Sequence, residues 1–142
     1  MTVETHTVSV ASQGNAHVID LTGDVVTCLR HGTIRDGIVT VFVVGSTAAI
    51  STTEFEPGLV TNDLGVAYER LAPENARYLH EETWHDDNGH SHVRSTMTGP
   101  SITVPLVDGQ MTLGTWQQII LLDFDTRPRD RRVIVQVLGD AG

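Results

Sequence analysis

The sequence predicts a single α+β domain with a mostly antiparallel sheet and two main helices. Short Val-, Ile- and Thr-rich runs bounded by turn residues predict seven or eight strands. The Asp108-Gly109 pair between two such runs is typical of a two-residue hairpin. An apolar stripe at helical spacing follows Val60. Strands that outnumber helices in this way favour an α+β arrangement, and the absence of a repeat or linker indicates one domain over residues 1–142.

The first half of the chain alternates expected strands with two helices. The expected strands are Thr2–Ser12, His17–Leu21 and Ile38–Val44, the last a nearly continuous β-branched run predicted to be central and buried. Thr22 can cap a helix that Gly32 ends. Gly45 to Thr53 is small and hydroxyl-rich, which lets a backbone or a ligand approach closely.

The second helix and the later strands follow. Pro57 suits the first turn of a helix that runs to Leu71, where Pro73 stops it. His80 to Ser95 is predicted to be an irregular connection, and long connections of this kind are often functional. The strands expected after it are Val93–Thr98, Ser101–Val107, Gln110–Leu113, Trp116–Phe124 and Val133–Leu138.

Composition restricts the partners of the protein. Eighteen acidic residues against nine basic ones give a net charge of -9, and every basic residue is arginine. An acidic chain is a poor match for nucleic acid, whose binding depends on neutralised phosphates, and no apolar run is long enough for a bilayer. The absence of lysine excludes Schiff-base chemistry on a lysine. Cys28 is alone, so no intrachain disulfide can form, which favours a cytoplasmic location.

Histidines gather in the segment from His80 to Ser95. Four of the seven histidines of the chain lie there, at positions 80, 85, 90 and 92, among the carboxylates of Glu81, Glu82, Asp86 and Asp87. Imidazoles and carboxylates at this density can bind a divalent metal or exchange protons near neutral pH. The alternative is a solvated acidic loop that carries scattered histidines.

A metal site can be sketched from this segment. If the strand from Val93 begins early, His90 and His92 point to one face of it, and His80 would complete a three-histidine set typical of catalytic zinc. Glu54 or Glu82 could complete or orient the site, and Asp86-Asp87 could hold a divalent metal, although an adjacent acid pair is usually a solvated turn. The alternative is that the histidines only hydrogen-bond neighbouring carboxylates.

Other polar and aromatic residues suggest a small phosphorylated substrate. Hydroxyls at Ser46, Thr47, Ser95 and Thr96, with the guanidinium of Arg94, could receive a phosphate. Trp116 could stack on a flat heterocycle while Gln117 bonds its edge, although a tryptophan is more often part of a core.

Motifs spread over most of the chain resemble those of the YjbQ family. They are Ser46-Thr47-Ala48-Ala49-Ile50, Tyr78-Leu79-His80, Asn88-Gly89-His90-Ser91-His92, Gly99-Pro100-Ser101, Gly114-Thr115-Trp116-Gln117, Arg131-Arg132-Val133 and Gln136-Val137-Leu138-Gly139. The resemblance covers about Val18 to Gly139, and Glu54 to Gly58 resembles the archaeal branch. It implies a compact α+β fold, a homotrimer and secondary thiamine-phosphate synthase activity.

The resemblance also implies site residues. Matching positions place His80, His92, Glu54 and Asp63 in catalysis and Trp116 and Gln117 beside the substrate. Gly45 stands where many members have a histidine, so His85 or His90 would have to replace that group.

Two functions are therefore open. The first is an enzyme acting on a small phosphorylated heterocycle through histidines and carboxylates that could bind a divalent metal, zinc or magnesium. The second is a non-catalytic trimer that binds a metal or a small ligand. In either case we expect His80, His92, Glu54, Asp63, Trp116 and Gln117 to converge on one cleft, within one chain or across a subunit boundary, which Gly45 would widen.

Overall fold

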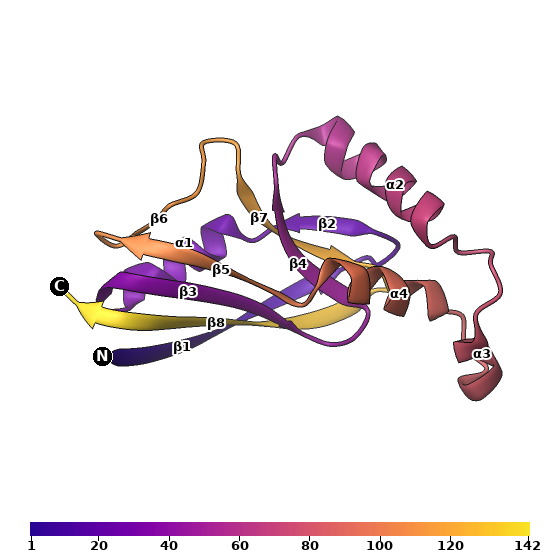
Figure 1. Ribbon diagram of the computed structural model, residues 1–142, viewed down its shortest axis with the longest axis horizontal. Helices are drawn as coiled ribbons and strands as arrows, with labels where there is room; N and C mark the ends of the chain where they lie inside the picture. The colour runs from indigo at the N-terminus through magenta and orange to yellow at the C-terminus, as the bar shows by residue number, and fades with distance from the viewer.

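The computed structural model describes residues 1–142 and contains two antiparallel sheets and four α-helices (Figure 1). The strands are β1 (Thr2–Ser12), β2 (His17–Asp20), β3 (Ile34–Val44), β4 (Ala48–Thr53), β5 (Ser101–Val107), β6 (Gln110–Met111), β7 (Gln118–Asp123) and β8 (Arg129–Ala141). The helices are α1 (Thr22–His31), the π-helical turn η1 (Leu59–Asp63), α2 (Leu64–Leu71), α3 (Leu79–Trp84) and α4 (Gly89–Thr98). The predicted α+β fold is confirmed.

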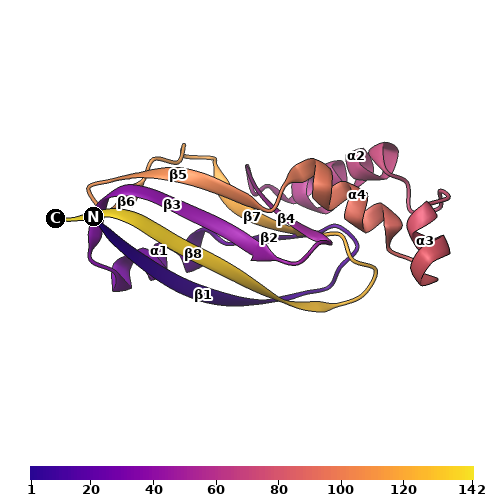
Figure 2. The ribbon, with the colours of Figure 1, turned by 60° about the horizontal axis from the view of Figure 1, so that its bottom comes forward.

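The two sheets are built from different parts of the chain. Five strands in the order β1-β8-β3-β5-β6 form the larger sheet, and β2-β7-β4 form the smaller one. Strand β1 pairs with β8 from Thr2 opposite Gly139, so the two termini lie at the same end of the molecule (Figure 2). Asp108 and Gly109 both have positive φ, 51° and 77°, and join β5 to β6 as the predicted hairpin.

Apolar side chains fill two layers of the fold. Seventeen buried residues from α1 and from both sheets form the main core. A second cluster of six buried residues, which include Phe124 and Val60 of η1, lies on the other face of the small sheet. Leu64 and Tyr68 of α2 pack against it. Strand β7 is buried along almost all of its length because it contributes to both clusters, which explains its unbroken Ile-Ile-Leu-Leu run.

Strand β3 differs from the prediction of a fully buried strand. Its alternate residues Val39, Val41 and Val43 are fully buried, whereas Ile38 and Phe42 each keep 41% of their surface exposed. The β-branched run does form a central strand of the sheet, but only one of its faces meets the core. The outer face of the five-stranded sheet is uncovered in the single chain.

The histidine segment is helical, which corrects two predictions. Residues predicted to form an irregular connection make α3 and the start of α4, and Val93–Thr98 belongs to α4 instead of a strand. Long-range bonds decide this conformation, since the Ser95 hydroxyl donates to the carbonyl of Ala48 at 2.6 Å and the Ser91 hydroxyl donates to that of Phe124. These contacts hold α4 against β4 and override the local β propensity of the sequence.

Candidate functional site

His80 and His92 lie together where α3 and α4 meet the start of β4. Their ring centroids are 4.5 Å apart and the ring planes are inclined by 60°. His80 is the second residue of α3, and His92 lies in the first half of α4. The loop between the two helices contributes Asp86 and Asn88. We call His80, Asp86, Asn88 and His92 the histidine cluster.

The hydrogen bond made by His92 fixes its tautomer. Its Nδ1 lies 3.1 Å from the carbonyl oxygen of Ser46, which can only accept, so Nδ1 carries the proton. The lone pair of Nε2 is then free for a proton or a metal, because the neutral imidazole has one donor and one acceptor nitrogen. His92 is only partly buried, so this lone pair is available to a ligand.

Asp86 and Asn88 orient His80. His80 Nε2 lies 3.3 Å from Asp86 Oδ1, and both side chains are about one-third exposed, at 30% and 33%. The side-chain nitrogen of Asn88 can donate to Asp86 Oδ1 at 3.1 Å and to Oδ2 at 3.2 Å. The carboxylate therefore has partners on two sides, and a positive charge on His80 would be stabilised by it.

A single chain does not complete a metal site around this pair. No three His, Cys, Asp or Glu side chains converge in a geometry that could hold a metal. The prediction that His90 and His92 share a face is wrong, because in a helix of 3.6 residues per turn positions two apart point in nearly opposite directions. His90 is instead buried, at 2% exposure, with no partner for its Nδ1. Burial, and then the charge of Arg94, lower its pKa.

A second polar group lies behind the loop from Gly45 to Thr47. Arg131 donates through Nε and Nη2 to the two carboxylate oxygens of Asp123, at 2.6 and 2.8 Å, and through Nη2 to the Thr47 hydroxyl at 2.7 Å. Thr47 and Arg129 both donate to Asp125 Oδ2, at 3.0 and 2.9 Å. We call Thr47, Asp123, Asp125, Arg129 and Arg131 the ion-pair network.

Ionisation in this network is strongly coupled to the fold. Burial alone would raise the pKa of Asp123, but the hydrogen bonds from Arg131 and Ser12 hold that pKa below its usual value. The hydrogen bonds to Asp123 also raise the pKa of Arg131. Arg131 is 8% exposed and Asp123 is fully buried, so the charges are held inside the protein by each other.

Gly45 leaves one nitrogen of Arg131 accessible. A Cβ atom at position 45 would lie 2.7 Å from Arg131 Nη1, and the φ of Gly45 is +138°. Arg131 makes all its hydrogen bonds through Nε and Nη2. Nη1 has no hydrogen-bond partner in the chain, yet it is not fully enclosed. The fully enclosed side-chain nitrogens that lack a partner are His6 Nε2 and His90 Nδ1. Gly45 is therefore part of the packing around Arg131, and the room expected there for a histidine ring stays a prediction.

Two residues predicted to receive a phosphate are engaged within the chain. Arg94 is 5% exposed and donates to the carbonyl of Ala72 at 3.0 Å and to Glu69 at 2.7 Å. The hydroxyl of Ser95 bonds to β4 as described above. Both side chains hold α4 in place. Of the predicted phosphate-binding residues, Ser46 and Thr96 are exposed beside the histidine cluster, and the Thr96 hydroxyl donates to the carbonyl of His92 at 2.7 Å, while Thr47 is buried in the ion-pair network.

The other predicted site residues lie near the far end of β4. Gln117 donates to the Thr52 hydroxyl at 3.1 Å and accepts from the backbone of Gly114, which fixes the loop before β7. Trp116 in this loop is 73% exposed, so it is not a core residue. Glu54 follows β4 and is exposed, as is Asp63 at the end of η1, whose carboxylate accepts from Asn62 at 2.9 Å.

The predicted residues thus form two groups in one chain. Strand β4 has six residues and pairs with β7 so that Ala48 faces Asp123 and Thr53 faces Gln118. At about 3.3 Å per residue, its ends are roughly 17 Å apart. Figure 1 shows α4 at one end of β4 and the loop before β7 at the other. His92 and Trp116 therefore do not share a cleft within one chain.

Asn88 and Arg131 belong to the site but were not predicted as site residues. Asn88 lies inside a motif that was noted for its histidines, and Arg131 inside a motif that was noted for family resemblance. Only the signal of resemblance pointed to them, because Arg131 meets Thr47 across 84 positions of sequence. Asp86, predicted with Asp87 to be able to hold a divalent metal, is the partner of His80 within the chain.

These observations define a class of protein. Its members have an antiparallel two-sheet α+β fold with a pair of histidines beside a glycine-containing loop. The description of the matching family is "UPF0047 protein YjbQ-like", and its model covers residues 6–140. The chain belongs to the YjbQ family, which confirms the resemblance described above.

Relatives and solved structures agree with this assignment. A UPF0047 protein of Archaeoglobus fulgidus is 40% identical over 85% of this chain and 90% of its own. One from Methanothermobacter thermautotrophicus is 38% identical over 98% and 94%. The crystal structure of a hypothetical protein from Aeropyrum pernix K1 superposes with a TM-score of 0.89 at 32% identity, covering 96% of this chain and 99% of that one. No helix here is both long and apolar enough to span a membrane.

Proposed function

We propose that this protein is a homotrimer whose site lies between subunits and acts on a small phosphorylated heterocycle, in the manner of a secondary thiamine-phosphate synthase. The observation that supports it is the incomplete histidine cluster. His92, with a free Nε2, and His80, held by Asp86, lie at one end of β4, and an exposed glutamate and tryptophan lie near the other. Head-to-tail association in a closed ring brings unlike ends of neighbouring subunits together.

Each group has a role in this proposal. The anionic part of the substrate lies at Gly45 and Ser46, where Arg131 Nη1 and backbone N–H groups can donate to it. The neighbour's Trp116 stacks on the heterocycle, for which its exposed ring is suited. His92 Nε2 takes up or delivers a proton, and Asp86 stabilises the charged form of His80.

The reaction class follows from the resemblance to the family. Joining the two halves of thiamine phosphate forms a bond between a thiazole nitrogen and a pyrimidine methylene carbon, and breaks the bond from that carbon to pyrophosphate. The leaving group carries the electron pair and gains negative charge, which donors beside Gly45 and a protonated His80 can stabilise.

The proposed metal, zinc or magnesium, depends on the partner subunit. His80 and His92 supply two nitrogens, and His90 points elsewhere. The donors present in one chain do not fit a metal, so no step of the reaction is assigned to it. A carboxylate such as Glu54 from a neighbour would complete a site of the three-ligand kind.

The second candidate is a trimer that binds a small anionic ligand without catalysis. Gly45 favours it, since this position provides an opening to a permanently charged guanidinium instead of an acid–base group. A cytoplasmic location belongs to both candidates and is supported by the lone Cys28.

Subunit complementation tests the shared site. We expect light scattering to give a trimer and His92→Ala and Glu54→Ala each to abolish binding of thiamine monophosphate, measured by calorimetry. Trimers co-expressed from both variants should regain about a quarter of the sites, because a random mixture leaves that share of boundaries with both residues intact. A monomer, or no regained binding, contradicts the shared site.

Metal and product measurements separate the remaining alternatives. Metal content of the purified protein should fall in the double variant His80→Ala, His92→Ala and stay the same in His17→Ala, His31→Ala, whose histidines lie elsewhere on the surface. Formation of thiamine phosphate from its two precursors identifies the enzyme. Ligand binding without product formation identifies the binding protein.

A further inference from the structure

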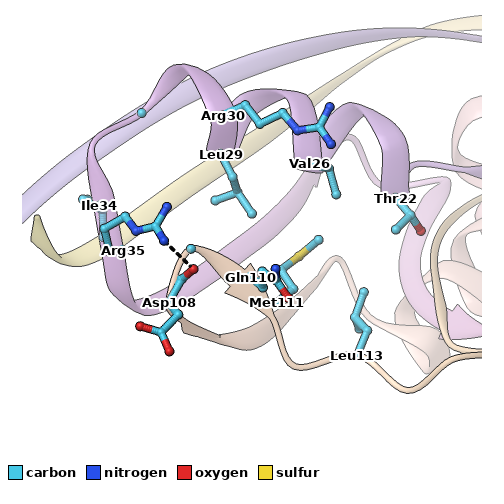
Figure 3. A pocket seen from close by; sticks show the side chains of 12 residues that line it. Thr22, Val26, Leu29, Arg30, Ile34, Arg35, Asp108, Gln110, Met111 and Leu113 are labelled. Carbon is cyan, nitrogen blue, oxygen red and sulfur yellow. Dashed lines mark hydrogen bonds between the residues drawn. The ribbon is translucent and has the colours of Figure 1, made fainter. Parts of the chain in front are cut away.

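A cavity of about 620 Å³ lies away from the histidine cluster, between α1 and the hairpin of β5 and β6 (Figure 3). Small-molecule sites usually have volumes of about 300–1,000 Å³. None of the residues discussed above as site residues lines this cavity, and it is open on one side. We call it the α1 groove.

The floor of the α1 groove is aliphatic. Val26 and Leu29 of α1 face Met111 and Leu113 of the hairpin side, and Ile34 closes the inner end. The first four side chains are only partly buried, so a ligand could remove more of their surface from water. Apolar area buried in this way stabilises a complex by roughly 25 cal/mol per Å² before the costs of association.

Two arginines stand at the rim of this floor. Arg30 and Arg35 line the groove, and neither forms an ion pair with a carboxylate, although acidic residues outnumber basic ones two to one. Arg77, Arg94, Arg129 and Arg131 do have carboxylate partners, whereas Arg70, Arg127 and Arg132, which lie outside the groove, have none either. The only acidic residue in the lining is Asp108, and its carboxylate points away from the space between helix and hairpin (Figure 3).

The hairpin turn holds Arg35 in place. Its Nη2 donates to the carbonyl of Asp108 at 2.7 Å. A Cβ on Gly109, whose φ is +77°, would lie 2.6 Å from Arg35 Nη1, so the glycine allows the guanidinium to lie against the turn. A guanidinium fixed in this way loses little side-chain entropy when it binds an anion, which strengthens the interaction.

We infer that the α1 groove binds a small organic anion, with an aliphatic body on the floor and a carboxylate at Arg35, while Arg30 adds a second positive charge towards the other end of the groove (Figure 3). No aromatic side chain lines the groove, so nothing there would stack on a nucleobase or another flat ring. An aliphatic carboxylate matches both the floor and the rim. This site is separate from the one proposed for catalysis, and neither depends on the other.

Octanoate and its uncharged counterpart octanol test the inference by calorimetry with the whole protein. We expect octanoate to bind with a stoichiometry of one per chain, and Arg35→Gln to weaken it about tenfold, the loss expected for one charged hydrogen bond, while octanol binding stays the same. Arg30→Gln should weaken octanoate binding by a smaller factor, because its charge acts from the other end of the groove. Leu29→Gln should weaken both probes, and Arg70→Gln, a substitution on α2, should change neither.

Three results would overturn the inference. One is the absence of saturable octanoate binding to the wild-type protein. Another is equal binding of octanoate by the wild type and by the Arg30→Gln, Arg35→Gln double variant. The third is dissociation of the wild-type oligomer by Leu29→Gln, which would assign the groove to a second copy of the chain. Since Arg30 makes no hydrogen bond, Arg30→Gln should retain the wild-type melting temperature, and its binding result is free of a folding defect.

Discussion

The ion-pair network and the histidine cluster lie on either side of the loop from Gly45 to Thr47, yet they differ in one respect. In the ion-pair network almost every donor and acceptor has a partner, and the charges of Asp123, Asp125 and Arg131 are buried. In the histidine cluster the side chains of His80, Asp86 and His92 are partly exposed, and the Nε2 of His92 has no partner in the chain. A saturated set of polar groups fixes a fold, whereas an unsaturated set can bind a ligand. The loop connects the two, because Thr47 belongs to the network and Ser46 holds His92.

The largest expected effect comes from breaking the ion-pair network. Asp123→Ala leaves the buried guanidinium of Arg131 without its charge partner, which should lower the free energy of unfolding by about 3–5 kcal/mol. His92→Ala removes one partly exposed hydrogen bond and should cost about 1 kcal/mol. Urea unfolding at one fixed protein concentration measures both. Equal losses in the two variants would mean that the histidine cluster is as structural as the network.

This contrast explains which parts of the protein were predictable from sequence. The Asp108-Gly109 hairpin and the helix ending at Leu71 depend on neighbours in sequence, and both are present in the structure. Helix α4 was mistaken for a strand, since its hydroxyl anchors on β4 and the end of β7 are more than thirty positions away in sequence.

The site was predictable only in part, for the same reason. His80 and His92 were chosen correctly as neighbours, but His90 was placed with them by strand geometry that the helix does not have. No local pattern could indicate that Arg131 lies behind Gly45, because β8 reaches this loop only when both sheets are assembled.

A substitution at Gly45 should give an intermediate effect. Gly45→Ala forces a Cβ into a backbone conformation with positive φ and against Arg131 Nη1, which should cost about 1–3 kcal/mol of unfolding free energy. It should also weaken binding of an anionic ligand at the loop, because the methyl group covers the free nitrogen. Gly65→Ala is the matched control: position 65 is in α2 with open space around its Cβ, and alanine there should stabilise by up to about 1 kcal/mol. If Gly45→Ala keeps both stability and anion binding, the loop does not provide access to Arg131.

The smallest effect concerns pH, and it separates the buried charges from a buried neutral group. Asp123 and Asp125 have pKa values held below their usual range, so they stabilise the fold at neutral pH and this stabilisation is lost as the pH falls below the usual carboxyl range, about 3.8. His90 has a pKa lowered by burial from 6.5, so below about pH 6.5 the unfolded chain takes up its proton first. The fold therefore begins to lose stability at a higher pH than the one at which the two carboxylates are protonated.

His90→Gln should therefore flatten the decline in the urea midpoint between about pH 6.5 and 5 without altering the steeper decline below about pH 4. His31→Gln, an exposed histidine at the end of α1, should leave both parts of the curve as in the wild type. An unchanged slope above pH 5 in His90→Gln would show that the unpartnered Nδ1 is not protonated on unfolding in this range, and would contradict the prediction.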